Sequence, residues 1–224
     1  DGQPATEELQ RVKLSSKWVD DGVFSTDRYG NEIATTPHAA EGLQESAICD
    51  SAGRTVAPLL FELTAGTHTL FFDLQDGGCE ITEVSLRKPA EIAAYAPGNA
   101  SGDGLIVIEA ENIASRNESS IRGAGEFNAR LSPYDNDYRK VNFLDGASFD
   151  EAGDMVTWKF NVEESGWYNL GAYYRQSARA DFPTYVDIYV DGAIPHAGAQ
   201  RVAFDYSTSF THMQAMAGED ALTL

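Results

Sequence analysis

Three consecutive strand-like runs between residues 154 and 195 constrain the fold of this chain more than any other feature. The first run, 156–162, alternates apolar and polar residues, and that period of two is typical of a half-buried β-strand. The second run, 167–176, carries aromatic residues on both faces, and the third, 184–190, alternates again. Asp191-Gly192 then gives a strong hairpin signal. The stretch therefore predicts an antiparallel meander.

Other short strands are predicted on both sides of this meander. Residues 58–86 read as three strands joined by Gly-rich turns, residues 105–112 as a β-branched strand, and residues 201–206 as one more strand. Strands of four to ten residues separated by turns favour an all-β chain over alternating helices and strands. We therefore expect an antiparallel β-sandwich.

A segment rich in Pro and Gly divides the chain. Residues 97–104 have the density of helix- and strand-breaking residues that marks a domain boundary, and Pro89 could open a short helix just before them. We expect a first part over residues 1–88, a linker over 89–104 and a second part over 105–224.

The charge excludes several classes of partner. The chain carries 35 acidic and 16 basic residues, a formal net charge of −19, which repels phosphate backbones and anionic membranes. No run approaches the roughly 18 to 20 apolar residues of a membrane span. The chain begins at Asp1 and not at Met, so we expect a mature or excised fragment.

Cys49 and Cys79 are the two cysteines of the chain. Their spacing does not fit a metal site, and the sequence leaves open whether they form a disulfide or remain two buried thiols.

The sequence carries no signature of catalysis. It has no Gly-x-Ser-x-Gly elbow, no metal-binding histidine spacing and no phosphate-binding glycine loop. Its Asp and Glu residues lie mostly at turns, and no pair stands out as the two carboxylates of a glycosidase. We therefore expect a protein that is not an enzyme.

Several short motifs resemble carbohydrate-binding modules of families 6 and 35. Residues 108–112 (Ile-Glu-Ala-Glu-Asn) look like the opening strand of such a module, and residues 58–63 with 66–70 look like its closing hairpin. Gly-Trp-Tyr at 166–168 and Tyr-Val-Asp-Gly at 189–192 are similar to strands of tandem modules in bacterial extracellular solute-binding lipoproteins of sugar ABC transporters.

The resemblance implies a jelly-roll sandwich of the galactose-binding type on the bacterial cell surface. It also implies an unusual order, with a closing half (1–88) before an opening half (105–224). The two halves either belong to neighbouring modules or complete one sandwich together. In these families the paired glutamates of the opening strand contribute to a structural calcium site, which makes Glu109 and Glu111 the metal candidates. The alternative is two solvated carboxylates at a sheet edge.

A sugar site needs an aromatic platform for the apolar ring face and polar groups for the hydroxyls. Because aromatic residues alternate along the second run of the meander, one set is expected to pack inward and the other to face a groove. The inward set is Trp158, Tyr168 and Tyr174. The candidate ligand-binding residues are Trp167, Tyr173 and Arg175, followed by Tyr134 and Tyr138 in the loop between the second part's early strands.

These observations lead to an expected function. The chain is expected to be a non-catalytic, extracellular carbohydrate-binding module, attached as an accessory domain to a bacterial solute-binding protein of a sugar ABC transporter. Two alternatives stay open: a structural spacer or interaction domain, and an accessory module of a secreted glycoside hydrolase.

Overall fold

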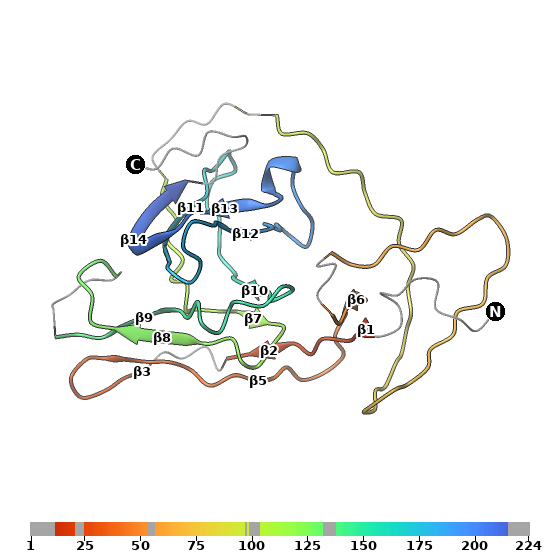
Figure 1. The fold of residues 1–224 in the computed structure, drawn as a ribbon, viewed down its shortest axis with the longest axis horizontal. Coiled ribbons are helices and arrows are strands. Elements are labelled where there is room, and N and C mark those ends of the chain that lie inside the picture. Colours follow the sequence, from red (N-terminus) through yellow and green to blue (C-terminus); the bar gives the residue numbers. More distant parts are fainter. Residues whose placement is uncertain are drawn as a thin grey trace.

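The computed structural model describes residues 12–20, 25–52, 57–96, 98, 104–131 and 138–214. Within them the chain is all-β, as the sequence predicts, and every strand pair is antiparallel (Figure 1). The helical element among these residues is a single 3-10 turn, η2 (Ala197–Ala199). No helix in the described part of the chain is long and apolar enough to cross a membrane.

A four-stranded sheet joins the first part of the chain to the second. Its order is β10-β7-β2-β5, with β2 (Trp18–Val19) and β5 (His38–Ala39) from the first part and β7 (Ser115–Arg116) and β10 (Val156–Thr157) from the second. Trp18 pairs with Ala39 on one side and with Arg116 on the other. The two predicted parts therefore share one sheet.

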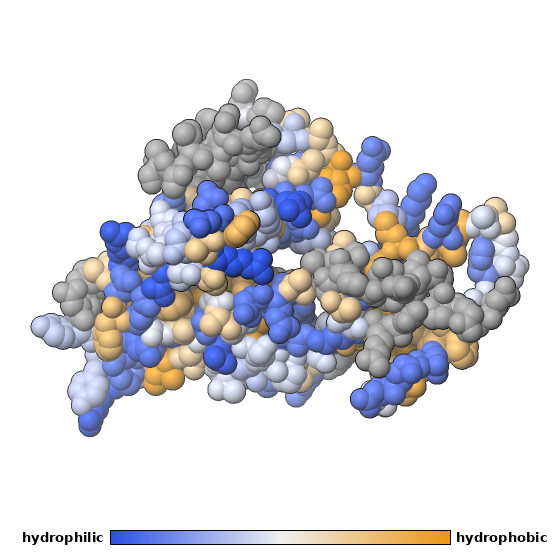
Figure 2. Space-filling model, in the orientation of Figure 1, coloured by the Kyte–Doolittle hydropathy of each residue, from blue (hydrophilic) through white to orange (hydrophobic). Residues whose placement is uncertain are grey.

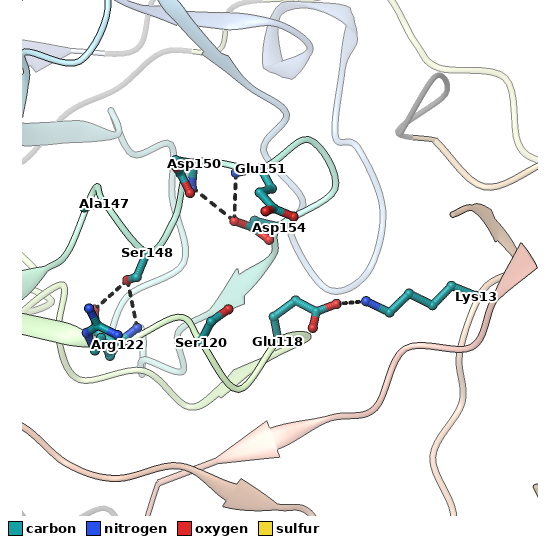
Figure 3. Close-up of a pocket in the computed structure, with 9 residues that line it drawn as sticks. All are labelled: Lys13, Glu118, Ser120, Arg122, Ala147, Ser148, Asp150, Glu151 and Asp154. Carbon is teal, nitrogen blue, oxygen red and sulfur yellow. Dashed lines mark hydrogen bonds and ion pairs between the residues drawn. The ribbon is translucent and has the colours of Figure 1, made fainter. Parts of the chain in front are cut away.

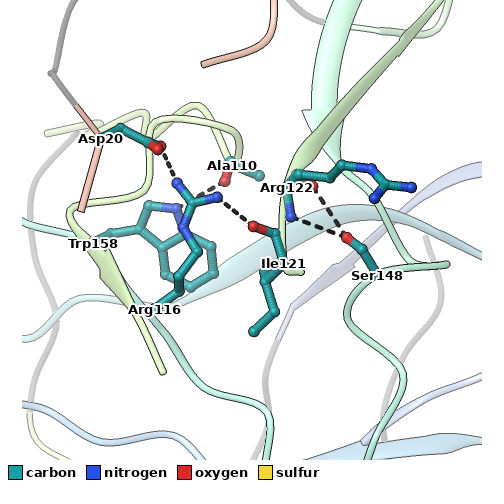
Figure 4. A network of polar contacts seen from close by, with 7 residues as sticks. All are labelled: Asp20, Ala110, Arg116, Ile121, Arg122, Ser148 and Trp158. Atoms are coloured by element: carbon teal, nitrogen blue, oxygen red, sulfur yellow. Dashed lines mark hydrogen bonds and ion pairs between the residues drawn. The ribbon is translucent and has the colours of Figure 1, made fainter. Parts of the chain in front are cut away.

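A buried ion pair lies beside this junction. The Arg116 side chain is 1% exposed and that of Asp20, just after β2, is 5% exposed. The Arg116 guanidinium donates to the Asp20 carboxylate and to the carbonyl oxygen of Ile121 (Figure 4). Asp20 Oδ1 and Arg116 Nε have no hydrogen-bond partner in the described structure. The pair thus links the two parts of the chain away from water.

The hairpin β3 (Ser25–Thr26) and β4 (Glu32–Ile33) forms a second contact between the parts, against the hairpin β8 (Gly123–Glu126) and β9 (Val141–Leu144). The Glu32 backbone N–H donates to the Lys140 carbonyl oxygen at 3.1 Å. Asp27 closes the β3–β4 turn by accepting from Asn31, and that hydrogen bond lowers the pKa of Asp27.

The remaining strands form three two-stranded pairs. These are β1 (Val12–Lys13) with β6 (Cys49–Asp50), β11 (Gly171–Gln176) with β14 (Ser207–Gln214), and β12 (Thr184–Val186) with β13 (Val202–Phe204). After β12 the predicted hairpin turn is confirmed. Val190 bridges to Ala193, and Asp191 and Gly192 both have positive φ, 51° and 81°, as a tight primed turn requires.

The main hydrophobic cluster lies where β14 meets β9. Phe210 is 6% exposed and packs with Leu131, Val141 and the partly buried Phe143. The rings of Phe210 and Phe143 meet edge to face with centroids 5.6 Å apart. This cluster joins the β11–β14 pair to the β8–β9 pair.

Four sequence-based predictions are wrong. The three runs between residues 154 and 195 do not form a meander, because their strands β10, β11 and β12 pair with β7, β14 and β13 and not with one another. Residues 58–86 form no strand, residues 105–112 form no strand, and the described residues after Pro89 form no helix. A strand requires hydrogen-bonding partners on a neighbouring strand. Residues 60–92 find none within the described chain, although their alternation is that of a sheet. The prediction was based on the alternation of side chains. That alternation indicates that a segment could form a strand, but it does not indicate whether a partner strand is present.

Both cysteines are free thiols. Cys49 in β6 is half-buried, and burial raises the pKa of its thiol, whereas Cys79 is exposed. The disulfide alternative is therefore not seen.

Candidate functional site

Arg175 lies at an irregularity in the β11–β14 pair. Tyr174 pairs with Thr211 and Gln176 with Ser207, so three residues of β14, among them Phe210, oppose Arg175 alone. Such a bulge redirects side chains from the regular alternation. The Arg175 guanidinium lies 4.6 Å from the centroid of the Phe210 ring. The bulge thus brings a cation onto the face of a core aromatic ring.

A bidentate ion pair holds this guanidinium. Arg175 Nη1 and Nη2 each donate to one carboxylate oxygen of Glu126 at the end of β8, both at 2.9 Å. Asn128 Nδ2 donates to the same carboxylate at 2.7 Å. The hydrogen bonds from Arg175 lower the pKa of Glu126. Arg175 therefore faces the β8–β9 hairpin and not an open groove, which corrects the predicted orientation.

Tyr173 lies next to this ion pair and is 48% exposed. Its ring centroid is 6.1 Å from that of Phe210, and it is two residues from Arg175 along β11. The structure therefore brings two of the predicted ligand-binding residues together. It adds Glu126, which holds Arg175 in place, and Asn128 donates to the same carboxylate. Sequence reasoning missed Glu126, because an isolated acidic residue among glycines gives no sign of its partner 49 residues away.

The other predicted ligand-binding residues lie elsewhere. Trp167 is 58% exposed and its indole lies against Gly98, where an added Cβ would come within 2.0 Å of the indole nitrogen. Tyr138 is 87% exposed, and Tyr134 lies outside the described residues. No ring contact joins Trp167 to Tyr173 in the described structure. Trp167, Tyr173 and Arg175, which were predicted to share one face, therefore lie at two separate places.

The inward-facing set is confirmed in part. Tyr174 meets Phe204 edge to face at 4.9 Å, and Trp158 is half-buried and donates its indole N–H to the Ala110 carbonyl oxygen at 3.0 Å. Tyr168, in contrast, is 47% exposed. Its hydroxyl donates to the Glu164 carbonyl oxygen of the preceding turn at 2.6 Å, and among the described residues the segment 158–170 makes no backbone hydrogen bond.

Three carboxylates gather near Glu111. Glu111 is 7% exposed and its Cβ lies beneath Gly123, where an added Cβ would be 3.5 Å away. The pKa of Glu111 is raised to about 7, chiefly by burial and in addition by the nearby charges of Glu109 and Glu32. Glu32 Oε2 accepts the backbone N–H of Asn142 at 2.7 Å. Within the described residues no group of three or more acidic, His or Cys side chains has the geometry of a metal site.

A separate polar cleft lies between β1 and the second part (Figure 3). The Lys13 ammonium reaches across it to the Glu118 carboxylate, and Asp154 accepts the backbone N–H groups of Asp150 and Glu151, each at 3.1 Å. It is lined by Lys13, Glu118, Ser120, Arg122, Ala147, Ser148, Asp150, Glu151 and Asp154. It contains no aromatic ring and none of the residues predicted to bind a ligand.

No family model, no curated protein and no solved structure matches this chain.

Proposed function

We propose that this chain is a non-catalytic carbohydrate-binding module whose ligand site is formed by Tyr173, Arg175, Glu126 and Asn128. The observation that supports the proposal most directly is the half-exposed Tyr173 ring beside a fixed bidentate pair of Arg175 and Glu126. An accessory role in a bacterial solute-binding protein of a sugar transporter follows from the motif resemblance and is proposed on that basis alone.

The chemistry of the four side chains suits a hydroxyl-rich ligand. A pyranose ring presents apolar C–H groups on a face, which an aromatic ring can cover, and hydroxyls at its edge, which need donors and acceptors. Arg175 uses two of its five N–H groups on Glu126, so further donors remain. Because the guanidinium is already held by Glu126, little side-chain entropy is lost when it binds a hydroxyl.

Tyr173→Ala is expected to weaken glycan binding by about tenfold or more, which corresponds to about 1.4 kcal/mol. The physical reason is loss of the ring that covers the sugar face. Isothermal titration against hits from a glycan array measures the effect. Tyr29→Ala is the matched control, because Tyr29 is 68% exposed in the β3–β4 turn. Absence of binding to every glycan by the unmodified protein would overturn the proposal and favour a structural spacer.

We also propose that a calcium ion binds at Glu109 and Glu111, as the motif resemblance implies. Oxygen atoms of carboxylates are the ligands that Ca²⁺ prefers, and a dication would offset the mutual repulsion of these two side chains.

Glu111→Gln provides the test. Without metal, the unfolded carboxyl loses its proton near pH 4.5 and the folded one near pH 7. Stability should therefore fall as pH rises through that window, by about 3 kcal/mol at most, and Glu111→Gln should remove this fall. Urea unfolding in chelator measures it, with the exposed Glu163→Gln as control. Calcium should raise the melting temperature of the unmodified protein and leave that of Glu111→Gln unchanged; equal shifts in both would contradict the calcium site.

A further inference from the structure

Two segments with strand-like sequences remain without strand partners. We call residues 57–92 the arm and residues 158–170 the open strand. Among the described residues, the backbone groups of residues 60–92 and of the open strand make no backbone hydrogen bond. Figure 1 shows the arm as a long excursion at the right of the molecule, apart from the segment that joins β10 to β11. Each segment presents unpaired N–H and C=O groups to which another strand could bind.

Both segments expose large apolar side chains. On the arm, Leu60 is 74% and Phe71 73% exposed, and on the open strand Phe160 is 54% and Leu170 51% exposed. Figure 2 shows apolar side chains at the surface of the projecting part, interleaved with charged ones. Exposed apolar area of this extent marks an interaction surface.

The amount of exposed surface indicates how large the missing contact is. The accessible surface is 17,176 Å², against about 10,000 Å² for a compact monomer of 24.3 kDa. The excess, about 7,000 Å² per chain, is larger than the roughly 1,000 to 2,500 Å² or more that each partner contributes to an obligate interface. A small ligand or a short peptide covers far less. The occupant is therefore expected to be a folded chain.

The arm is fixed at both ends in a conformation that projects outward. The Leu59 N–H donates to the Ile48 carbonyl oxygen at 2.9 Å, and the Ala93 carbonyl oxygen accepts from Ala197 at 2.8 Å. Tyr95, just beyond the arm, packs on His196 with ring centroids 4.8 Å apart. Between these anchors the arm leads away from its own open strand, so it is positioned to reach another molecule.

We propose that this chain forms a two-fold dimer in which the arm of each copy pairs with the open strand of the other. A second copy of the chain supplies a partner strand for both segments at once. Because the arm of each copy pairs with the open strand of the other, the assembly is closed at two chains. The acidic charge of −19 on each copy opposes the contact, so added salt should strengthen the dimer.

Light scattering after size exclusion tests the proposal over a wide range of protein concentration. The unmodified protein should have twice the mass of one chain, and Phe71→Lys on the arm or Phe160→Lys on the open strand should give the mass of one chain. Leu43→Lys, at a 76% exposed residue outside both segments, should keep the dimer. Circular dichroism should show the β-content of the unmodified protein in Leu43→Lys and a lower β-content in Phe71→Lys and Phe160→Lys, which lose the strand pairs between the copies.

Two results would overturn it. One is a monomer at every concentration and salt level. Hydrogen exchange would then distinguish two cases. Protected arm amides would mean that the arm folds back onto its own chain, and unprotected arm amides would mean that it has no partner. The other is a dimer that both Phe71→Lys and Phe160→Lys leave intact, which would place the interface on another surface.

Discussion

Arg116→Ala is expected to lower the free energy of unfolding by about 3 to 5 kcal/mol, because it leaves the carboxylate of Asp20 buried without its cation. The Arg116 and Asp20 side chains are 1% and 5% exposed, so water cannot replace the lost partner. Urea denaturation followed by tryptophan fluorescence measures the change. Asp20→Ala should cost a similar amount for the reciprocal reason.

The exposed ion pair between Lys13 and Glu118 supplies the matched control. Its side chains are 53% and 32% exposed, so Lys13→Ala should cost no more than about 1 kcal/mol. The double variant Arg116→Met with Asp20→Leu should recover much of the lost stability, because it removes both buried charges. A loss below 1 kcal/mol for Arg116→Ala would show that the pair is hydrated.

Phe210→Ala is expected to cost about 3 to 5 kcal/mol, because it opens a cavity in the cluster that joins β14 to β9. The same change removes the ring beneath Arg175, so sugar binding should weaken together with stability. Thermal unfolding and glycan titration on the same sample measure the two effects.

Two further variants separate these effects. Phe127→Ala, at a 61% exposed ring near β8, should leave stability within about 0.5 kcal/mol of the unmodified protein. Phe210→Leu keeps most of the volume and should cost less than the alanine variant. Equal losses for Phe210→Ala and Phe127→Ala would place Phe210 outside the core.

The sequence predicts local features of this fold better than its pairings. The turn at Asp191-Gly192 and the strand at Val202–Phe204 are found where expected, because turn chemistry and alternation act over a few residues. The prediction of strands over 58–86 is wrong, because the alternating pattern carries no information on whether a partner strand is present. Strand formation depends on that partner.

In the candidate site, too, the sequence indicates individual residues better than it indicates their partners. Tyr173 and Arg175 can be selected from the sequence because aromatic and planar cationic side chains alternate there. Their surroundings cannot, since the irregular pairing opposite Arg175 and its contact with Phe210 depend on β14, which lies farther along the chain. Glu126 becomes visible as a partner only when two segments 49 residues apart meet.

The sheet pairing between β2 and β7 also sets an order of events during synthesis. Asp20 and Arg116 are 96 residues apart in the chain, and β10 follows β7 by a further 40 residues. Non-local contacts of this kind form slowly, because a long loop must close before they contribute any stabilisation. During synthesis β2 therefore has to wait, with an open edge, until the chain has grown by the 96 residues that separate Asp20 from Arg116. Chaperone binding during this interval should fall on β2 and β5, whose sheet still lacks β7.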